Sequence, residues 1–319
     1  MSRYWPFRLT GFGRCWSNWV AFLDRQEPGT TLALWRIACG LCLVGTIAAV
    51  VLAGAVPLLW LPPADGGYTQ PATPWLFRQI GGVTPATVKG MVALTLIAGV
   101  LTAVGLGGRI AVLAALQGFL ALMGLNSDAT GGHDSVISNG LWLLVLSRST
   151  ETLSLDCRLR TGRWTSERPV PAWPRYLAIF QLVLIYWSTG LHKMSAAWTP
   201  AGGFSALYYI LQQPTWQRWD MSWLAWLYPL TQLGTALTWV WEITAPLLLL
   251  ALWYRATPQR PGLFRRLFNR INFRRLFVLM GVAVHVGIFV CLEVGPFSWI
   301  MLAFYICLYR PEEWRIGWR

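Results

Sequence analysis

"LALWRIACGLCLVGTIAAVVLAGAVP", residues 32–57, contains one charged residue, Arg36, in 26 positions. A helix that crosses the roughly 30 Å hydrocarbon core of a bilayer needs about 20 mainly apolar residues. The apolar residues here run continuously instead of alternating, which favours a membrane-spanning helix over a strand of a β-barrel. No small-residue cleavage signature closes the stretch, so we expect an uncleaved helix rather than a signal peptide.

The composition of the whole chain points to the same class of protein. Hydrophobic residues make up 55% of the 319 residues and charged residues only 12%, whereas soluble domains carry roughly 25% charged residues. The 21 tryptophans are typical of a chain that meets bilayer interfaces. A soluble protein of this composition would expose large apolar patches, so the composition indicates an integral membrane protein.

Apolar stretches of suitable length recur along the chain. We therefore predict an all-α polytopic integral membrane protein with about eight transmembrane helices. The fourth and eighth stretches are short, and we expect them to be tilted, partly re-entrant or longer than their apolar part. The eight predicted spans are 32–57, 88–107, 109–126, 135–148, 176–193, 228–253, 275–292 and 297–309.

The basic residues give this arrangement an orientation. With both termini in the cytoplasm, 22 of the 26 lysines and arginines fall on the cytoplasmic side and four on the outer side. This bias is the one that the positive-inside rule predicts for a multi-pass membrane protein, and we expect that membrane to be the cell inner membrane. The net charge of +13 therefore reflects topology and contact with anionic lipid, and we expect no nucleic-acid partner. The four outer residues are Arg78, Lys89, Lys193 and Arg218.

We expect a single folded domain, at residues 31–310, between a cytoplasmic N-terminal segment at 1–30 and a cytoplasmic tail at 311–319. Cys39 and Cys42 form a C-x-x-C pair within the first predicted span. Redox-active pairs have this spacing, but in an apolar helix it more often marks two small packing residues. The further soft ligands of a zinc or iron site are not visible, so we expect no metal.

The stretch "IYWSTGLHKMSAAWTPAGG", residues 185–203, ends an apolar run with His192 and Lys193. Lys193 is one of only two lysines, because the chain uses arginine nearly everywhere else. An arginine serves as well for contact with lipid headgroups, but only a lysine that has lost its water can give up its proton near neutral pH. We therefore interpret Lys193 as a candidate base; the alternative is a lysine that snorkels to the outer surface. Helical spacing places Lys193 on one face with Tyr186 and Gly190, and the glycine leaves room for a close approach.

Three further ionisable residues lie in or beside the predicted spans, where such residues are functional candidates. His133 is expected at the outer start of the fourth span, and it is the candidate partner of Lys193. Glu242 and His285 are expected at similar depths in the sixth and seventh spans. We predict that they pair, either as a structural hydrogen bond or as polar residues of a pocket.

The outer stretch 214–229 places Trp216, Trp219, Trp223 and Trp226 at steps of three and four residues. This spacing predicts a helix with four indoles on one face, lying in the outer interface. It is either a membrane anchor or a lid over a lipid-soluble substrate.

Several of these stretches together resemble a known family. "YWSTGLHKMSAAWTPAGG", residues 186–203, is similar to the Y-x-x-x-G-x-x-K-x-x-x-x-W-x-x-G segment of vitamin K-dependent γ-glutamyl carboxylase and of its bacterial relatives with the horizontally transferred transmembrane (HTTM) domain. "GGHDSVISNGLWLLVLS" (131–147), "WVWEITAPLLLL" (239–250) and "VAVHVGIFVCLEVGPFSWIMLAFY" (282–305) resemble other parts of the same domain, in the same order.

The resemblance implies a carboxylase-like pocket that opens to the outer face. Lys193 would deprotonate a reduced quinone of the vitamin K type with the help of His133. The pocket would be lined by Tyr186, His192, Trp198, Glu242 and His285. Oxygen would then convert the quinol into a strong base. The carboxylases have a second lysine where this chain has His192, and they continue into a large lumenal region that binds a propeptide, so we do not expect peptide carboxylation to carry over.

The alternative interpretation is a non-enzymatic membrane factor. Such a protein would bind a partner peptide or protein and serve its maturation, export or immunity. A transporter is disfavoured, because no inverted repeat or pair of broken helices is visible.

Overall fold

The structure, a computed structural model, describes residues 11–314; the predicted cytoplasmic residues 1–10 and 315–319 lie outside this range. It is mostly helical. The first half contains α1 (Gly11–Leu23), β1 (Gln26–Pro28), α2 (Thr30–Leu52), α3 (Val56–Trp60), α4 (Trp75–Gln79), α5 (Pro85–Val104), α6 (Gly108–Met123), α7 (Gly132–Leu146) and α8 (Leu155–Thr161). The second half contains β2 (Pro169–Pro171), α9 (Trp173–His192), α10 (Ala206–Leu211), α11 (Tyr228–Ile243), α12 (Pro246–Ala256), α13 (Leu263–Ile271), α14 (Phe273–Cys291) and α15 (Phe297–Tyr305). Short 3₁₀ helices connect them: η1 (Pro63–Asp65), η2 (Ser127–Ala129), η3 (Ala196–Trp198), η4 (Pro200–Gly202), η5 (Ser222–Leu227), η6 (Ile306–Leu308) and η7 (Pro311–Trp314).

By length and composition, three helices among the described residues can cross a membrane: α2, α5 and α14. A fourth span is added if η5 with α11 and the following α12, which are bent by 58° relative to one another, are counted together. Helices α6 and α15 are apolar but shorter. The protein is therefore a helical membrane protein, while the number of eight spans remains a prediction.

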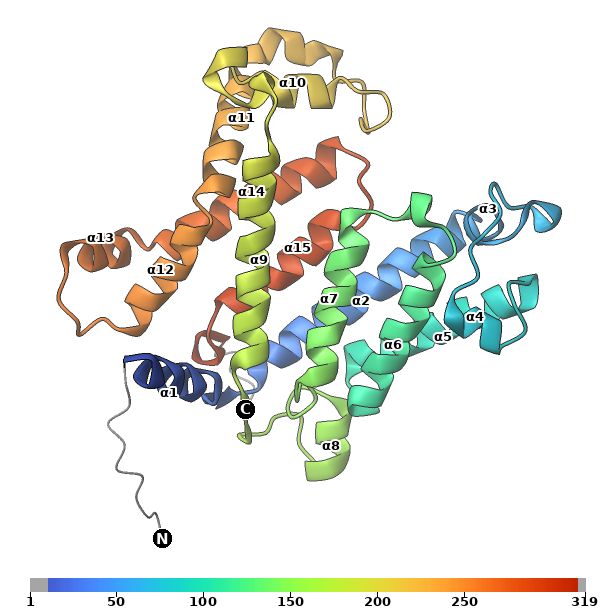
Figure 1. The fold of residues 1–319 in the computed structure, drawn as a ribbon, viewed down its shortest axis with the longest axis horizontal. Helices are drawn as coiled ribbons and strands as arrows, with labels where there is room; N and C mark the ends of the chain where they lie inside the picture. The colour runs from blue at the N-terminus through green and yellow to red at the C-terminus, as the bar shows by residue number, and fades with distance from the viewer. Residues whose placement is uncertain (1–10, 315–319) are drawn as a thin grey trace.

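In Figure 1, α7 and α9 stand beside one another in the centre, and α2 and α15 pass obliquely behind them. Helices α5 and α6 lie on one flank and α12 and α13 on the other, while α14 passes behind α9. Helix α10 marks one end of the molecule and α8 the opposite end. The core between these helices is apolar, and Trp35, Phe119 and Phe304 are among its fully buried side chains.

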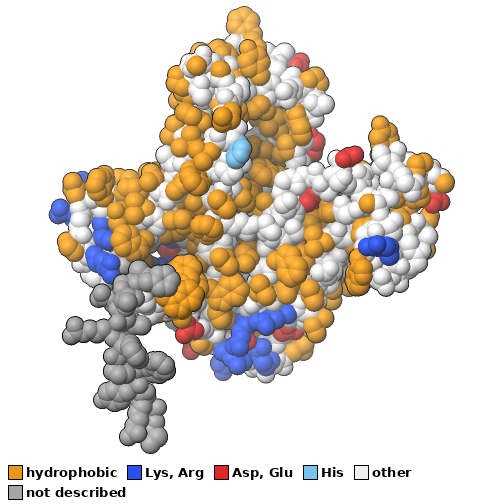
Figure 2. All heavy atoms as spheres, in the orientation of Figure 1, with side chains coloured by type: hydrophobic (Ala, Val, Ile, Leu, Met, Phe, Trp, Pro, Cys, Tyr) orange, Lys and Arg blue, Asp and Glu red, His pale blue; other side chains and the backbone are white. Residues whose placement is uncertain are grey.

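The outward faces of the long helices are apolar as well. On α9 they carry Leu177, Phe180, Leu184, Trp187 and Leu191, all exposed at steps of three and four residues. Such a stripe would be unfavourable in water but matches the hydrocarbon of a bilayer. Figure 2 shows this apolar surface across the middle of the visible face, with basic side chains gathered at the α8 end and around α13. Both features fit a molecule in a membrane: the apolar stripe faces the hydrocarbon, and the basic side chains lie at the ends, outside it.

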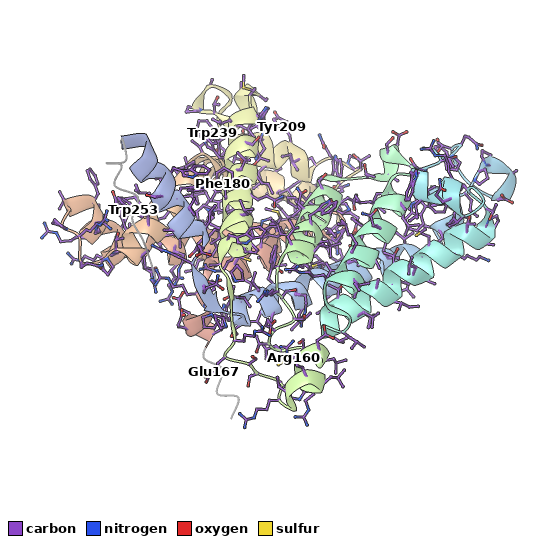
Figure 3. All side chains as sticks on the ribbon, turned by 60° about the horizontal axis from the view of Figure 1, so that its bottom comes forward. Arg160, Glu167, Phe180, Tyr209, Trp239 and Trp253 are labelled. Carbon is purple, nitrogen blue, oxygen red and sulfur yellow. The ribbon has the colours of Figure 1, made fainter. Side chains whose placement is uncertain are left out.

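The end near α8 is held by polar contacts from distant parts of the chain. Strands β1 and β2 pair antiparallel, with Gln26 opposite Pro171. Arg175, at the start of α9, contacts Glu27 with two nitrogens, and it also donates to the carbonyl oxygen of Cys307 at 3.2 Å. Figure 3 shows Arg160 and Glu167 at this end, and Tyr209 and Trp239 at the opposite one.

The prediction of one helix over residues 214–229 is wrong. The backbone of this segment bonds instead to the end of α14: the Glu293 N–H donates to the Trp216 carbonyl at 2.7 Å, and the Arg218 N–H donates to the Cys291 carbonyl at 3.0 Å. Because these groups are satisfied by α14, only the short η5 forms here. The four tryptophans are all exposed, but they do not share one helical face.

The predicted span 228–253 is also interrupted. Helix α11 ends at Ile243 and α12 begins at Pro246. Proline has no N–H with which to continue the helical ladder to the carbonyl of residue 242, and its ring crowds that carbonyl. The chain therefore bends directly after Glu242, and the carboxylate lies at a break rather than within a continuous helix.

Candidate functional site

The candidate site begins where α9 crosses α11. Gly190 is buried on α9, and a Cβ atom at this position would lie 3.0 Å from the Glu242 Cβ and 3.0 Å from the Ile243 backbone nitrogen. No larger residue fits without displacing α11. The close approach predicted for Gly190 is therefore confirmed, and it places Glu242 beside the end of α9.

Lys193 lies directly after α9, where the helix has ended. Its Nζ donates a hydrogen bond to Glu242 Oε2 and forms an ion pair with it. The Lys193 and Glu242 side chains are only 18% and 10% exposed. The amine also lies 4.7 Å from the ring centroid of Trp198, in cation–π contact. Lys193 is thus held between an indole and a carboxylate and does not extend into solvent.

The loop after Lys193 is shaped by two glycines. A Cβ at Gly202 would come within 2.5 Å of the Ala196 carbonyl, and Gly203 has a φ of +64°. A side chain at residue 202 would clash with Ala196, and the left-handed backbone at residue 203 favours glycine. The fold of η3 and η4 therefore depends on both glycines, and it positions Trp198 over the amine.

Beneath this pair, three polar side chains form a buried hydrogen-bonded chain. The Tyr186 hydroxyl lies 2.7 Å from His285 Nε2 and 2.8 Å from the Tyr305 hydroxyl. The prediction that Glu242 pairs with His285 is wrong. The bend after α11 directs Glu242 to Lys193, and His285 meets the tyrosine of α9 instead.

Sequence reasoning missed Tyr305 and Trp241. Tyr305 completes the hydrogen-bonded chain, and the Trp241 Nε1–H donates to the Phe277 carbonyl at 3.2 Å beside Tyr186. The sequence could have indicated Tyr305, because its hydroxyl lies in the apolar stretch 297–309. A hydroxyl buried at membrane depth needs a hydrogen-bond partner.

His192 is exposed and does not line this arrangement. Its Nδ1–H donates to the Ser188 carbonyl, 2.8 Å away on its own helix. The side chain is therefore turned back along α9, while the preceding Tyr186 and Gly190 face inward. The resemblance placed His192 in the pocket, and the structure places it on the outside of α9.

His133 lies at the start of α7, as predicted, with Nε2 3.3 Å from Asp134 Oδ1. The other Asp134 oxygen accepts the Gly131 N–H at 2.8 Å and so caps the helix. A cavity of about 60 Å³, lined in part by Trp60, Asn126 and His133, adjoins them. Within residues 11–314, no hydrogen bond or ion pair joins His133 to Lys193, so the structure does not bring the two candidates into contact.

The groups that could hold a metal are scattered. In the described part of the chain, no cluster of three or more His, Cys, Asp or Glu side chains could hold an ion. Cys39 is fully buried and Cys42 half-buried, and both are free.

Chemically, the site combines a group that can release a proton with one that can accept it. Lys193 Nζ is the donor and Glu242 Oε2 the acceptor of the hydrogen bond between them. The adjoining indole offers a flat apolar surface for an aromatic ligand. The protein is thus a helical membrane protein in which a buried proton donor and acceptor lie beside an aromatic surface.

Comparison with known proteins agrees with this class. Residues 25–212 match the model of one protein family, the HTTM domain. The chain belongs to the HTTM domain family, and it is a membrane protein. The matched range contains His133, Tyr186 and Lys193, whereas Glu242 and His285 lie beyond it. No curated protein and no solved structure matches the chain.

Proposed function

We propose that the protein spans the cell inner membrane eight times, with both termini in the cytoplasm. Two observations support this arrangement. Helices occupy each of the eight predicted stretches, the sixth as the bent pair α11 and α12, and 22 of the 26 basic residues fall on one side of the resulting topology. The Lys193 site then lies at the outer end of α9.

We further propose that Lys193 deprotonates the hydroxyl of a membrane-soluble quinol. The observation that supports this proposal is the ion pair between Lys193 Nζ and Glu242, whose side chains are both largely buried. The Trp198 ring covers the amine. The Lys193 proton passes to Glu242, and the neutral amine takes the proton of the quinol. The arginine used elsewhere in this chain cannot do this, because a guanidinium does not lose its proton.

The resemblance supplies the subsequent chemistry. In that chemistry a reduced quinone would react with O₂; its two hydroxyl hydrogens and one oxygen atom would end in water, and the other oxygen atom in the quinone epoxide. His133 is the second catalytic candidate that the resemblance gives, and its Nε2 lies 3.3 Å from Asp134 Oδ1. Tyr186 and His285 position the inner end of the site through their hydrogen bond.

The test is an assay of the purified protein in lipid nanodiscs with a reduced naphthoquinone, oxygen and labelled CO₂. We expect quinone epoxide from the wild type and a loss of at least about 100-fold in rate in Lys193→Met and Lys193→Arg. Lys89 is the only other lysine in the sequence, and it is exposed. Lys89→Met is therefore the matched control and should retain the wild-type rate. Equal epoxide formation by Lys193→Met would exclude the amine as the base.

A second candidate function rests on the outer end of the molecule. Trp216, Trp219, Trp223 and Trp226 are between 47% and 89% exposed, and such tryptophans suit a lipid interface or a partner peptide. In this alternative the protein is a non-enzymatic factor for the maturation, export or immunity of a peptide. Replacing Trp223 and Trp226 by serine would then abolish the peptide-dependent phenotype, while Lys193→Met would leave it unchanged.

A further inference from the structure

A groove at the opposite end of the molecule has no place in the quinol chemistry. It has a volume of about 370 Å³, within the range of small-molecule sites. Its walls come from the cytoplasmic halves of α2 and α5 in the proposed topology and from the loop around α8. The lining is wholly apolar: Ile37, Leu41, Ala103, Val104, Leu153, Leu155 and Trp164. Leu41 and Trp164 are 60% and 52% exposed, so the groove is open to whatever surrounds the protein.

The wall of the groove is a built structure rather than a chance depression. The Arg36 guanidinium, fully buried, donates to the carbonyl oxygens of Leu153 at 2.7 Å and Ser149 at 2.9 Å. Leu153 has a φ of +48°, an uncommon conformation for a branched apolar residue. Its N–H donates to the Trp164 carbonyl at 2.7 Å. Arg36 and the left-handed backbone of Leu153 thus fix Leu153 and Trp164 at the rim of the groove. Backbone strain of this kind is retained mainly where it serves a site.

The surroundings of the groove carry surplus positive charge. Residues 148–175 contain six arginines and three acidic residues. Arg160 and Arg168 are engaged by Glu151, and Asp156 accepts the Gly107 N–H. Arg158 and Arg163 are exposed, and in the part of the chain that the structure describes neither has an ion-pair partner. Arg158 lies three residues after Leu155 and so shares its face of α8, and Arg163 precedes Trp164.

We propose that this groove binds one acyl chain of an anionic phospholipid, with the headgroup at Arg158 and Arg163. The apolar lining selects hydrocarbon, because no polar group there could bind anything else. The two arginines select a negative headgroup at the depth where the chain leaves the hydrocarbon core, and Trp164 marks that interface. Figure 2 shows basic side chains concentrated at this end of the molecule.

The test measures lipid retained by the full chain. The protein is purified in mild detergent, phosphatidylglycerol or phosphatidylcholine is added, and bound lipid is counted by native mass spectrometry. We expect one tightly retained phosphatidylglycerol and no comparable phosphatidylcholine. The double variant Arg158→Gln, Arg163→Gln should retain phosphatidylglycerol about thirty-fold less tightly, as expected for two interfacial arginines.

A second, independent test fills the groove with a larger side chain. Leu41→Trp adds bulk at a lining position that is already exposed, so folding is preserved, and it should abolish the retained lipid. Leu52→Trp changes a leucine on the same helix, 86% exposed and outside the groove, and should retain it. The matched control for the Arg158→Gln, Arg163→Gln variant is the double variant Arg266→Gln, Arg270→Gln on α13. Unchanged retention in Leu41→Trp, equal retention of the two lipids, or a co-purified neutral quinone in the groove would each overturn the proposal.

Discussion

Two ends of this molecule use carboxylates in different ways. At the α8 end, Glu27 and Glu313 are each held by arginine: Arg175 reaches Glu27 at 2.7 and 2.8 Å, and Arg274 reaches both Glu313 oxygens at 2.6 Å. At the other end, Glu242 is held by a lysine, through one amine nitrogen.

The difference lies in what each cation can do. Guanidinium forms a rigid two-point fork and keeps its charge, so Arg175 and Arg274 act as structural clamps. An ammonium makes a single-point contact and can exchange its proton with the carboxylate. In a chain with 24 arginines and two lysines, the lysine stands where a proton could be moved, and the following variants test that distinction.

The largest effect is expected from Glu242→Ala. It leaves the Lys193 ammonium without its partner in a largely buried position, and we expect a loss of about 3 kcal/mol in unfolding free energy. The double variant Glu242→Met, Lys193→Met removes both charges and should recover most of that loss. Denaturant unfolding in detergent measures both. A double variant as unstable as Glu242→Ala would show that the pair, rather than the stranded charge, provides the stability.

The second-largest loss of unfolding free energy is expected from Arg175→Lys. The lysine cannot reproduce the two-point contact with Glu27 or the additional bond to Cys307, and we expect a loss of about 2 kcal/mol. Arg168→Lys is the control, because Arg168 is exposed and lies 3.9 Å from Glu151; its change should stay within about 0.5 kcal/mol. The reverse exchange, Lys193→Arg, should preserve the fold and remove the proposed activity. Equal losses in Arg175→Lys and Arg168→Lys would remove the contrast between clamp and surface pair.

Gly190→Ala probes the crossing that brings Lys193 and Glu242 together. The added methyl must displace α11, and we expect destabilisation by about 1.5 kcal/mol together with weaker substrate turnover. At Gly287 on α14, a Cβ meets no atom within 4 Å, so Gly287→Ala should be stabilising by about 0.5 kcal/mol through helix propensity. Thermal unfolding of the two variants side by side measures the difference. A neutral Gly190→Ala would mean that the helices are not tightly apposed there.

The smallest effect concerns pH. Burial alone would raise the pKa of Glu313, but the hydrogen bonds and charges of Arg274, the Arg310 N–H and Arg255 outweigh it and lower the pKa from 4.5 to about 2. The unfolded chain therefore binds the proton more tightly, so the contribution of Glu313 is complete above pH 4.5 and is lost as the pH falls towards 2. Thermal unfolding between pH 6 and pH 2.5 should show a shallower decline for Glu313→Gln than for the wild type. Parallel curves would contradict the role of the clamp.

The sequence was sufficient for the helical membrane class, for the positions of the long helices and for the family. It was also sufficient to single out Lys193 and Gly190, because a rare lysine and a glycine at the end of an apolar run are local signals. The partner of Lys193 was not predictable from depth along ideal helices: Pro246 breaks the ladder after Glu242 and turns it away from His285. The tryptophan periodicity of residues 214–229 predicted a helix, but pairing with the end of α14 satisfied the backbone first. Local patterns do not reveal such long-range competitors for hydrogen bonds.

The small ladder between β1 and β2 has a consequence for biogenesis. Residues 26–28 find their strand partners only at 169–171, and the neighbouring Thr31 hydroxyl donates to the carbonyl of Tyr309. A ribosome must therefore synthesise residues 169–171 before β1 can pair, and Tyr309 before the Thr31 hydroxyl can find its acceptor. We expect the early helices to leave the translocon loosely associated, and the contact between Thr31 and Tyr309 to be among the last to form.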